Sequence, residues 1–258
     1  MEIEVVQSGV TEIEVDVMVV NLFEGATAPS GATGDVDSAI GGVISELIAA
    51  GEITGAESEL TLIHTPKSAY PLFKPTRVLV AGLGLSESFD YDAIRRVSAS
   101  VIRKLRTSRV RHVATVVHGN CTGGLDTAAS AQAVVEGALL GSYRFLKYRT
   151  TDKYRTPDVS KLTVVEGDSL KLPAIKLGVE KAIVYSGAEI LARDLVNEPA
   201  NKLSPSDLAD TAKRVASENG LACIVLEEVD VIKLGMGAYV GVSQGGPRPL
   251  KFIHITYE

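Results

Sequence analysis

The chain alternates between short runs of β-branched and apolar residues and longer segments in which apolar residues recur three or four positions apart. The first pattern is typical of strands, and the second is typical of helices that bury one face. Through residue 166 the apolar runs predict strands over residues 2–6, 15–22, 59–64, 76–81, 112–117 and 162–166.

Helices are predicted between these strands. From Tyr91 to Leu105 the apolar residues repeat at helical spacing, as they do over residues 126–148. A glycine-rich connection over residues 25–34 precedes a helix predicted for residues 35–50, which ends at Gly51. Since helices that cross between strands lead to parallel neighbours, we expect an α/β fold in which a mostly parallel or mixed sheet is covered on both faces.

The last third of the chain predicts a second group of elements. A long helical pattern stops at Asn197, because Pro199 disfavours further helix, and Ser204 with Pro205 opens a helix over residues 206–219 that Gly220 closes. Strands are predicted for residues 221–226, 238–242 and 250–257, with one short turn over residues 231–234.

The final run is apolar on both faces, which indicates an interior strand. An interior strand needs neighbours on both sides, so we expect the fold to be incomplete at this point. Residues 149–161 are polar and predict a surface connection near a domain boundary. We therefore expect one domain over residues 1–160 and the beginning of another within residues 161–258.

Composition narrows the class of protein. The chain has 258 residues, of which 45% are hydrophobic and 22% charged, and this excludes disorder, collagen and coiled coil. No apolar stretch reaches the length of a membrane span, and the acidic N-terminus is unlike a signal peptide, so we expect a cytoplasmic protein. A net charge of −6 argues against a dedicated nucleic-acid binder.

The residues that most often carry chemistry are scattered. Cys121 and Cys223 are far apart and favour two reduced thiols over a disulfide framework. The histidines make no short-spaced ligand pair with one another or with a cysteine, so metal binding by them is not expected. They stand at His64, His112, His118 and His254.

Two local patterns have a chemical and a plain interpretation. Gly82-x-Gly84 follows a predicted strand, as in a dinucleotide-binding turn, but the third glycine and a directly following helix are missing. His118 and Cys121 could form a base and a nucleophile, but no third orienting group is identifiable. We prefer the plain interpretation of both: a turn, and a loop histidine beside a buried thiol.

Basic residues gather on the helix that begins at Tyr91 and at its exit, and Tyr143–Arg149 interleaves aromatic with basic residues. Such a mixture can bind nucleic acid, but on an acidic protein a solvated helix face or a subunit contact is the better interpretation. The cluster on the helix consists of Arg95, Arg96, Arg103, Lys104, Arg106, Arg109 and Arg111.

Longer motifs resemble a known family. Ala192–Pro205, which contains Asn-Glu-Pro, is similar to the opening of the catalytic domain of the leucyl aminopeptidase family, the cytosolic dinuclear metallopeptidases. The match continues through Leu234–Gly245, which contains Gly-Met-Gly, and extends over nearly the whole chain. Further stretches of resemblance are Pro247–Tyr257, Glu136–Tyr148 and Gly34–Gly84; Gly246 and Leu250 depart from the usual serine and proline in a turn.

The resemblance implies an N-terminal macro-domain-like mixed sheet with flanking helices, a linking helix around residues 177–196, and the incomplete start of an α/β metallopeptidase domain. The implied reaction removes N-terminal amino acids, often leucine, from peptides and amino-acid amides. Two divalent ions, zinc, manganese or magnesium, would activate a water and polarise the scissile carbonyl. The implied assembly is a hexamer.

In the family the metal ligands and the assisting residues lie beyond the final matched strand, and their motifs do not appear here. We therefore assign no catalytic, cofactor-binding or metal-binding residue to this chain and expect no metal ion and no peptidase activity in it alone. It would be a segment of a longer enzyme or a natural truncation.

A second hypothesis is a complete binding module for DNA or a nucleotide, or a truncated scaffold paralogue. Macro-like domains elsewhere hold ADP-ribose, and Arg103 and Arg106 would belong to a DNA footprint. Against ADP-ribose, Gly41–Leu47 lacks a fuller glycine run and an acidic adenine partner.

Overall fold

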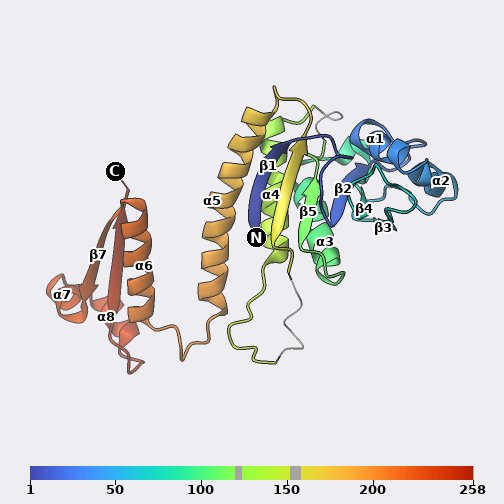
Figure 1. The fold of residues 1–258 in the computed structure, drawn as a ribbon. Helices are drawn as coiled ribbons and strands as arrows, with labels where there is room; N and C mark the ends of the chain where they lie inside the picture. Colours follow the sequence, from blue (N-terminus) through green and yellow to red (C-terminus); the bar gives the residue numbers. More distant parts are fainter. Residues whose placement is uncertain (120–123, 152–157, 258) are drawn as a thin grey trace. The chain divides into compact units, whose positions relative to one another are not determined.

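The computed structural model describes residues 1–119, 124–151 and 158–257 and divides the chain into two compact units, Met1–Leu191 and Ala192–Glu258. The first unit contains a six-stranded sheet in the order β1-β6-β5-β2-β4-β3 (Figure 1). Neighbouring strands are parallel except for β3 and β4. The strands are β1 (Glu2–Gln7), β2 (Val17–Leu22), β3 (Leu60–His64), β4 (Arg77–Gly82), β5 (His112–Thr115) and β6 (Lys161–Glu166).

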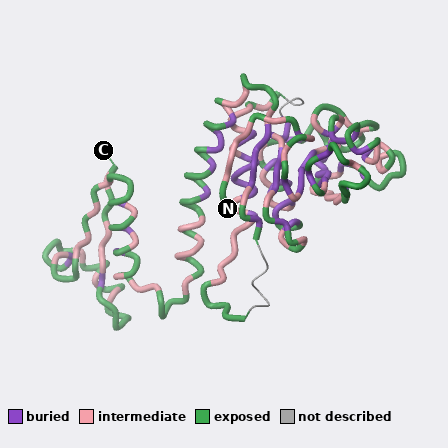
Figure 2. The backbone as a smooth tube through the Cα atoms, viewed as in Figure 1, coloured by how far each residue is buried: buried purple, intermediate pink, exposed green. Residues whose placement is uncertain are grey.

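Both faces of this sheet are covered, which confirms the predicted α/β class. Along β2, Val17 and Val19 belong to one apolar cluster and Met18 to another on the opposite face. The first cluster is closed by α3 and α4 and the second by α1 and α2, and Figure 2 shows buried residues concentrated along the strands. The described helices that begin in this unit are α1 (Gly31–Ala39), α2 (Val43–Ala49), the 3-10 turn η1 (Ser86–Ser88), α3 (Tyr91–Arg106), α4 (Thr127–Ser142) and α5 (Leu172–Asn197), whose residues from Ala192 onward belong to the second unit.

Small residues let α5 lie against α4. The buried residues Ile175, Val179 and Ala182 of α5 share an apolar cluster with Ala131 and Val135 of α4. At Gly178 the backbones come so close that an added Cβ would lie 2.0 Å from the carbonyl oxygen of Ala128. The packing of α5 against the sheet layer thus depends on the absence of a side chain at this position.

One predicted helix is two helices. The prediction of a single helix over residues 35–50 is wrong because Gly41 and Gly42 both adopt positive φ angles, 74° and 86°, which interrupt a right-handed helix. The helix α1 also begins at Gly31, inside the segment predicted as a glycine-rich connection. The chain therefore turns between α1 and α2.

The helix α4 ends at Ser142, earlier than the predicted end at Tyr148. The guanidinium of Arg106 donates hydrogen bonds to the carbonyl oxygens of Gly141 and Ser142, at 3.1 and 2.9 Å. These bonds satisfy acceptors at the end of a helix, which otherwise have no partner within it. A side chain from a neighbouring helix, outside any local pattern, thus helps to define the end of α4.

The second unit consists of an antiparallel pair of strands, one longer helix and two short helices. Ser204 and Asp207 form the predicted N-terminal cap of α6, and Gly220 ends it with a φ angle of 67°. The strand β8 pairs with β7 within the part of the chain that the structure describes, so a second neighbour for it stays a prediction. The elements are α6 (Pro205–Asn219), β7 (Ala222–Glu227), α7 (Glu228–Lys233), α8 (Gly237–Ser243) and β8 (Lys251–Thr256).

The strand predicted for residues 238–242 is wrong, because these residues lie in the helix α8. A short apolar run does not distinguish a strand from a helix. In the structure, Tyr239 of α8 packs edge to face on Phe252 of β8, with ring centroids 5.6 Å apart, and its hydroxyl donates to the carbonyl oxygen of Lys251. These contacts with β8 favour the helical conformation over the strand.

The division predicted at residues 160 and 161 stays a prediction. Strand β6 and the first part of α5 pack within the first unit. Along the chain, the first compact unit ends at Leu191 and the second begins at Ala192. Within the described ranges, no helix combines the length and apolar character needed to span a membrane.

Two glycines of α5 provide a matched test of its packing. Gly178→Ala should lower the free energy of unfolding by about 1–3 kcal/mol, because the new Cβ collides with the backbone of α4. Gly187→Ala should leave stability unchanged or raise it by about 0.5–1 kcal/mol, since nothing lies within 4 Å of its Cβ and alanine favours helix. Urea unfolding followed by circular dichroism measures both. Equal effects of the two substitutions would show that α4 and α5 do not pack closely.

Candidate functional site

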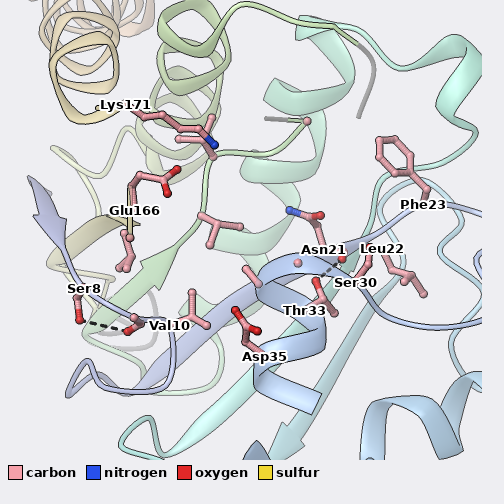
Figure 3. A pocket seen from close by; sticks show the side chains of 18 of the residues that line it. Ser8, Val10, Asn21, Leu22, Phe23, Ser30, Thr33, Asp35, Glu166 and Lys171 are labelled. Atoms are coloured by element: carbon pink, nitrogen blue, oxygen red, sulfur yellow. Dashed lines mark hydrogen bonds between the residues drawn. The ribbon is translucent and has the colours of Figure 1, made fainter. Parts of the chain in front are cut away.

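A cavity of about 360 Å³ opens at the carboxyl ends of the parallel strands in the first unit (Figure 3). The segments that follow β1, β2, β5 and β6 all contribute, because parallel strands end at the same edge of a sheet. The first turn of α1 and the residue before α5 complete its wall. The lining includes Ser8, Val10, Asn21, Leu22, Phe23, Ser30, Gly31, Thr33, Asp35, Val117, Gly119, Val165, Glu166 and Lys171.

The end of β2 is held in place beside this cavity by two hydrogen bonds. The hydroxyl of Thr33 in α1 donates to the backbone oxygen of Asn21 at 2.6 Å. The side-chain amide of Asn21 lies 2.9 Å from Nδ1 of His118. Because an amide nitrogen only donates, Nδ1 accepts and the proton of the neutral ring is on Nε2. Asn21 is therefore fixed from two directions.

His118 is buried and uncharged. Burial lowers its pKa from 6.5 to about 4, since removal from water disfavours the imidazolium. Cys121, the nucleophile in one of the hypotheses above, lies outside the described residues. Through its hydrogen bond with Asn21, His118 holds the side chain of a residue that lines the cavity.

Charges of both signs line the cavity. Lys171 extends into it from the residue before α5, while Glu166 at the end of β6 and Asp35 of α1 provide carboxylates (Figure 3). Glu166 accepts a hydrogen bond from the backbone of Asp168 at 3.0 Å. The cavity thus offers apolar walls and a few polar groups, as small-molecule sites do.

The glycines of the Gly82-x-Gly84 pattern do not line this cavity. A Cβ on Gly82 would lie 2.0 Å from the carbonyl oxygen of Ala56, and Gly84 has a φ angle of 76°. The glycines allow close packing of the loop around Gly55 and a turn. This favours the structural interpretation of the pattern.

Three residues of the predicted basic cluster are paired with carboxylates. Arg95 contacts Glu136 at 2.7 Å, Arg96 contacts Glu57 at 2.6 Å, and Arg106 contacts Asp158 at 3.1 Å. Such pairs reduce the positive charge available to phosphates. They favour a structural part for this helix face over nucleic-acid binding.

The histidines remain apart. His112 contacts the hydroxyl of Thr163 at 2.9 Å, and its pKa is lowered, mainly by burial. Over residues 1–119, 124–151 and 158–257, no group of three or more histidine, cysteine, aspartate or glutamate side chains is arranged to hold a metal ion.

Sequence reasoning did not identify the cavity. Its signal was present, because the residues directly after the predicted strands 2–6, 15–22, 112–117 and 162–166 meet at one edge once the strands are parallel. The polar residues at these ends, including Ser8 and Asn21, could have been collected on that basis.

Comparison with known proteins shows the family. Residues 19–152 match the N-terminal domain of the cytosol aminopeptidase family, and residues 190–258 match its catalytic domain. The chain belongs to the cytosol aminopeptidase family. The resemblance found in the sequence is thereby confirmed.

Curated members of the cytosol aminopeptidase family align with the whole chain. A probable cytosol aminopeptidase of Alkaliphilus metalliredigens is 31% identical over 259 residues, and one of Solibacter usitatus is 34% identical over 258 residues. The alignments cover 100% of this chain but 51% and 48% of those proteins. This cytosol aminopeptidase family member therefore spans about half the length of the relatives it matches.

Solved structures share the fold. A mutant of tomato leucine aminopeptidase superposes with a TM-score of 0.83 at 24% identity and covers 100% of this chain and 52% of its own. The bottromycin maturation enzyme BotP in complex with Mn gives a TM-score of 0.72 at 25% identity, with 95% of this chain and 45% of that one covered.

The buried state of His118 predicts a dependence of stability on pH. The unfolded chain takes up a proton on this histidine as the pH falls below 6.5, whereas the folded chain does so only near pH 4. The contribution of the neutral His118 to the free energy of unfolding is therefore complete above pH 6.5. It falls by about 1.4 kcal/mol per pH unit as the pH is lowered from 6.5 to about 4, or by about 3 kcal/mol in all.

His118→Asn keeps an acceptor near Nδ1 and removes the titration, so its unfolding free energy should fall less steeply from pH 6.5 to 4 than that of the natural chain. Urea unfolding at several pH values measures this slope. His254→Asn, at an exposed histidine, is the control and should keep the natural slope. Parallel slopes for His118→Asn and the natural chain would contradict the buried neutral imidazole.

Proposed function

We propose that this chain is the front part of a metallo-aminopeptidase that removes N-terminal amino acids from peptides and amino-acid amides. The observation that carries the proposal is the match to both domains of one peptidase family, in order, over residues 19–152 and 190–258. The names of the relatives point to the same reaction. Within the proposal, residues 1–160 form a macro-like domain and residues 161–258 the linking helix and the first part of the peptidase domain.

Exposed apolar side chains in the second unit support this proposal. Ile224 on β7 is 56% exposed and Val242 on α8 is 85% exposed, and neither belongs to a buried cluster. An antiparallel pair of strands is at best marginally stable in water unless a helix or further strands cover it, and α6 is the one longer helix among the described elements of this unit. The exposed side chains are suited to contact with additional strands and helices of a larger peptidase domain.

The proposed cofactor is a pair of divalent ions, zinc, manganese or magnesium, and the structure of BotP with Mn supports a metal in the family. When bound, such a pair activates a water and polarises the scissile carbonyl. The described residues of this chain do not fit that pair, since they provide no cluster of three or more suitable ligands. We assign them no metal ligand and no catalytic residue.

The proposed setting is the cytoplasm, which the names of the relatives support, and the proposed assembly is a homo-hexamer, for which the family resemblance is the basis. In such an assembly this part of the chain would contribute packing surfaces. The apolar side chains of α5 that are at least 46% exposed are suited to packing: Leu177, Ile183, Val184, Tyr185 and Val196.

The purified 258-residue chain should not hydrolyse leucine 4-nitroanilide with Zn²⁺, Mn²⁺ or Mg²⁺, because its described residues provide no group of three or more suitable metal ligands. The product of the complete native reading frame should hydrolyse it, lose the activity with a chelator and regain it with one of these ions. Circular dichroism of the 258-residue chain is the control for folding.

Metal-dependent turnover by the 258-residue chain would contradict this assignment. A stop codon directly after Glu258, with an intact mass of 27.2 kDa for the native protein, would contradict the aminopeptidase function itself.

A further inference from the structure

The cavity in the first unit lies where the path of the chain changes direction across the sheet. After β2 the chain adds β3 and β4 on one side, and then it crosses to place β5 and β6 on the other. The residues after β2 and β5 line the cavity between these two directions. In open α/β sheets, ligands bind at this position, outside the carboxyl ends of the strands.

The first turn of α1 gives the cavity a partial positive charge. Within the described residues, the backbone N–H groups of Gly31, Ala32 and Thr33 have no acceptor, and the side chain of Ser30 does not cap the helix. No acidic residue stands in the first turn. These residues line the cavity, so their donors are available to a carboxylate.

Lys171 adds a full positive charge in another part of the wall (Figure 3). Its ammonium group makes no ion pair or hydrogen bond with the part of the chain that is described. Its side chain is partly buried beside the first turn of α5, which reduces its contact with water. A carboxylate of a ligand would satisfy this group.

Negative charge is present in the same cavity, at Glu166 and Asp35. A polyanion such as a nucleotide would meet these carboxylates at close range, and like charges repel. A ligand with both a carboxylate and an ammonium group matches the two signs. The apolar side chains of Val10, Val117 and Val165, which are buried, provide a surface for its remainder.

We propose that this cavity binds a zwitterion of amino-acid to dipeptide size with an apolar side chain. The volume of about 360 Å³ is near the lower limit of ligand cavities, which suits molecules of this size. A free amino acid is also what an aminopeptidase releases, so the cavity would sense product. Only this link to product rests on the proposed function; the binding itself does not.

The test is isothermal titration calorimetry on the 258-residue chain with L-leucine and L-leucylglycine, which distinguishes the amino acid from the dipeptide. N-acetyl-L-leucine lacks the ammonium group and L-leucinamide lacks the carboxylate, so each should bind about tenfold or more weakly than the preferred zwitterion. Glycine, which lacks the apolar side chain, should also bind more weakly.

Substitutions in the cavity test which side chains bind the carboxylate of the ligand and which bind its ammonium group. Lys171→Met should weaken binding of the zwitterion about tenfold and leave binding of L-leucinamide unchanged, since that ligand has no carboxylate. Lys176→Met, at an exposed lysine outside the cavity lining, is the matched control and should bind like the natural chain. Glu166→Gln and Asp35→Asn should reduce the preference for L-leucine over N-acetyl-L-leucine.

Several outcomes would overturn the proposal. They are a Kd above about 10 mM for both zwitterions, equal binding by acetate or inorganic phosphate, tighter binding by ADP-ribose, or no effect of Lys171→Met. Because the experiment measures binding to this chain and needs no turnover, its failure is independent of the aminopeptidase assignment. Binding of leucine with an inactive full-length product would instead contradict only the link to catalysis.

Discussion

Burial of β2 and β4 on both faces is the constraint on which the rest of the first unit depends. Met18, Val20 and Val78 face one apolar cluster, whereas Val19 and Leu79 face the other. Strands of this kind cannot leave either face in water, so the helices between them must cover both sides. The resulting parallel order brings four strand ends to one edge and creates the cavity there.

A second layer of packing depends on the absence of side chains. Besides Gly178 on α5, Gly137 and Gly141 of α4 would each place a Cβ less than 3 Å from the backbone of α3. Three helices are thus held at distances that only glycine permits. This arrangement positions Lys171 at the start of α5, so the cavity wall depends on contacts along α4 and α5.

The fold was predictable from the sequence where the local signal and the tertiary environment agreed. The β-branched runs became strands because their apolar residues have two covered faces, and Ser204 and Gly220 bound α6 through their own backbone and side-chain chemistry. Predictions failed where contacts with residues distant in the sequence determine the conformation of a segment. Arg106 donates a hydrogen bond to a carbonyl oxygen at the end of α4. Tyr239 packs on β8 from α8, a helix whose sequence pattern predicted a strand. The cavity was missed because it joins residues from four strand ends that are adjacent only after the sheet has formed.

The order of the strands also affects the timing of folding during synthesis. The strand β1 lies at an edge of the sheet and pairs with β6, so that Gln7 is opposite Glu166. The strand β1 therefore leaves the ribosome well before β6, its partner in the sheet. At about 5–20 residues per second this delay is roughly 10–30 seconds, during which β1 has unpaired backbone groups on both sides. The acidic residues Glu2 and Glu4 reduce the tendency of this waiting strand to associate with other chains.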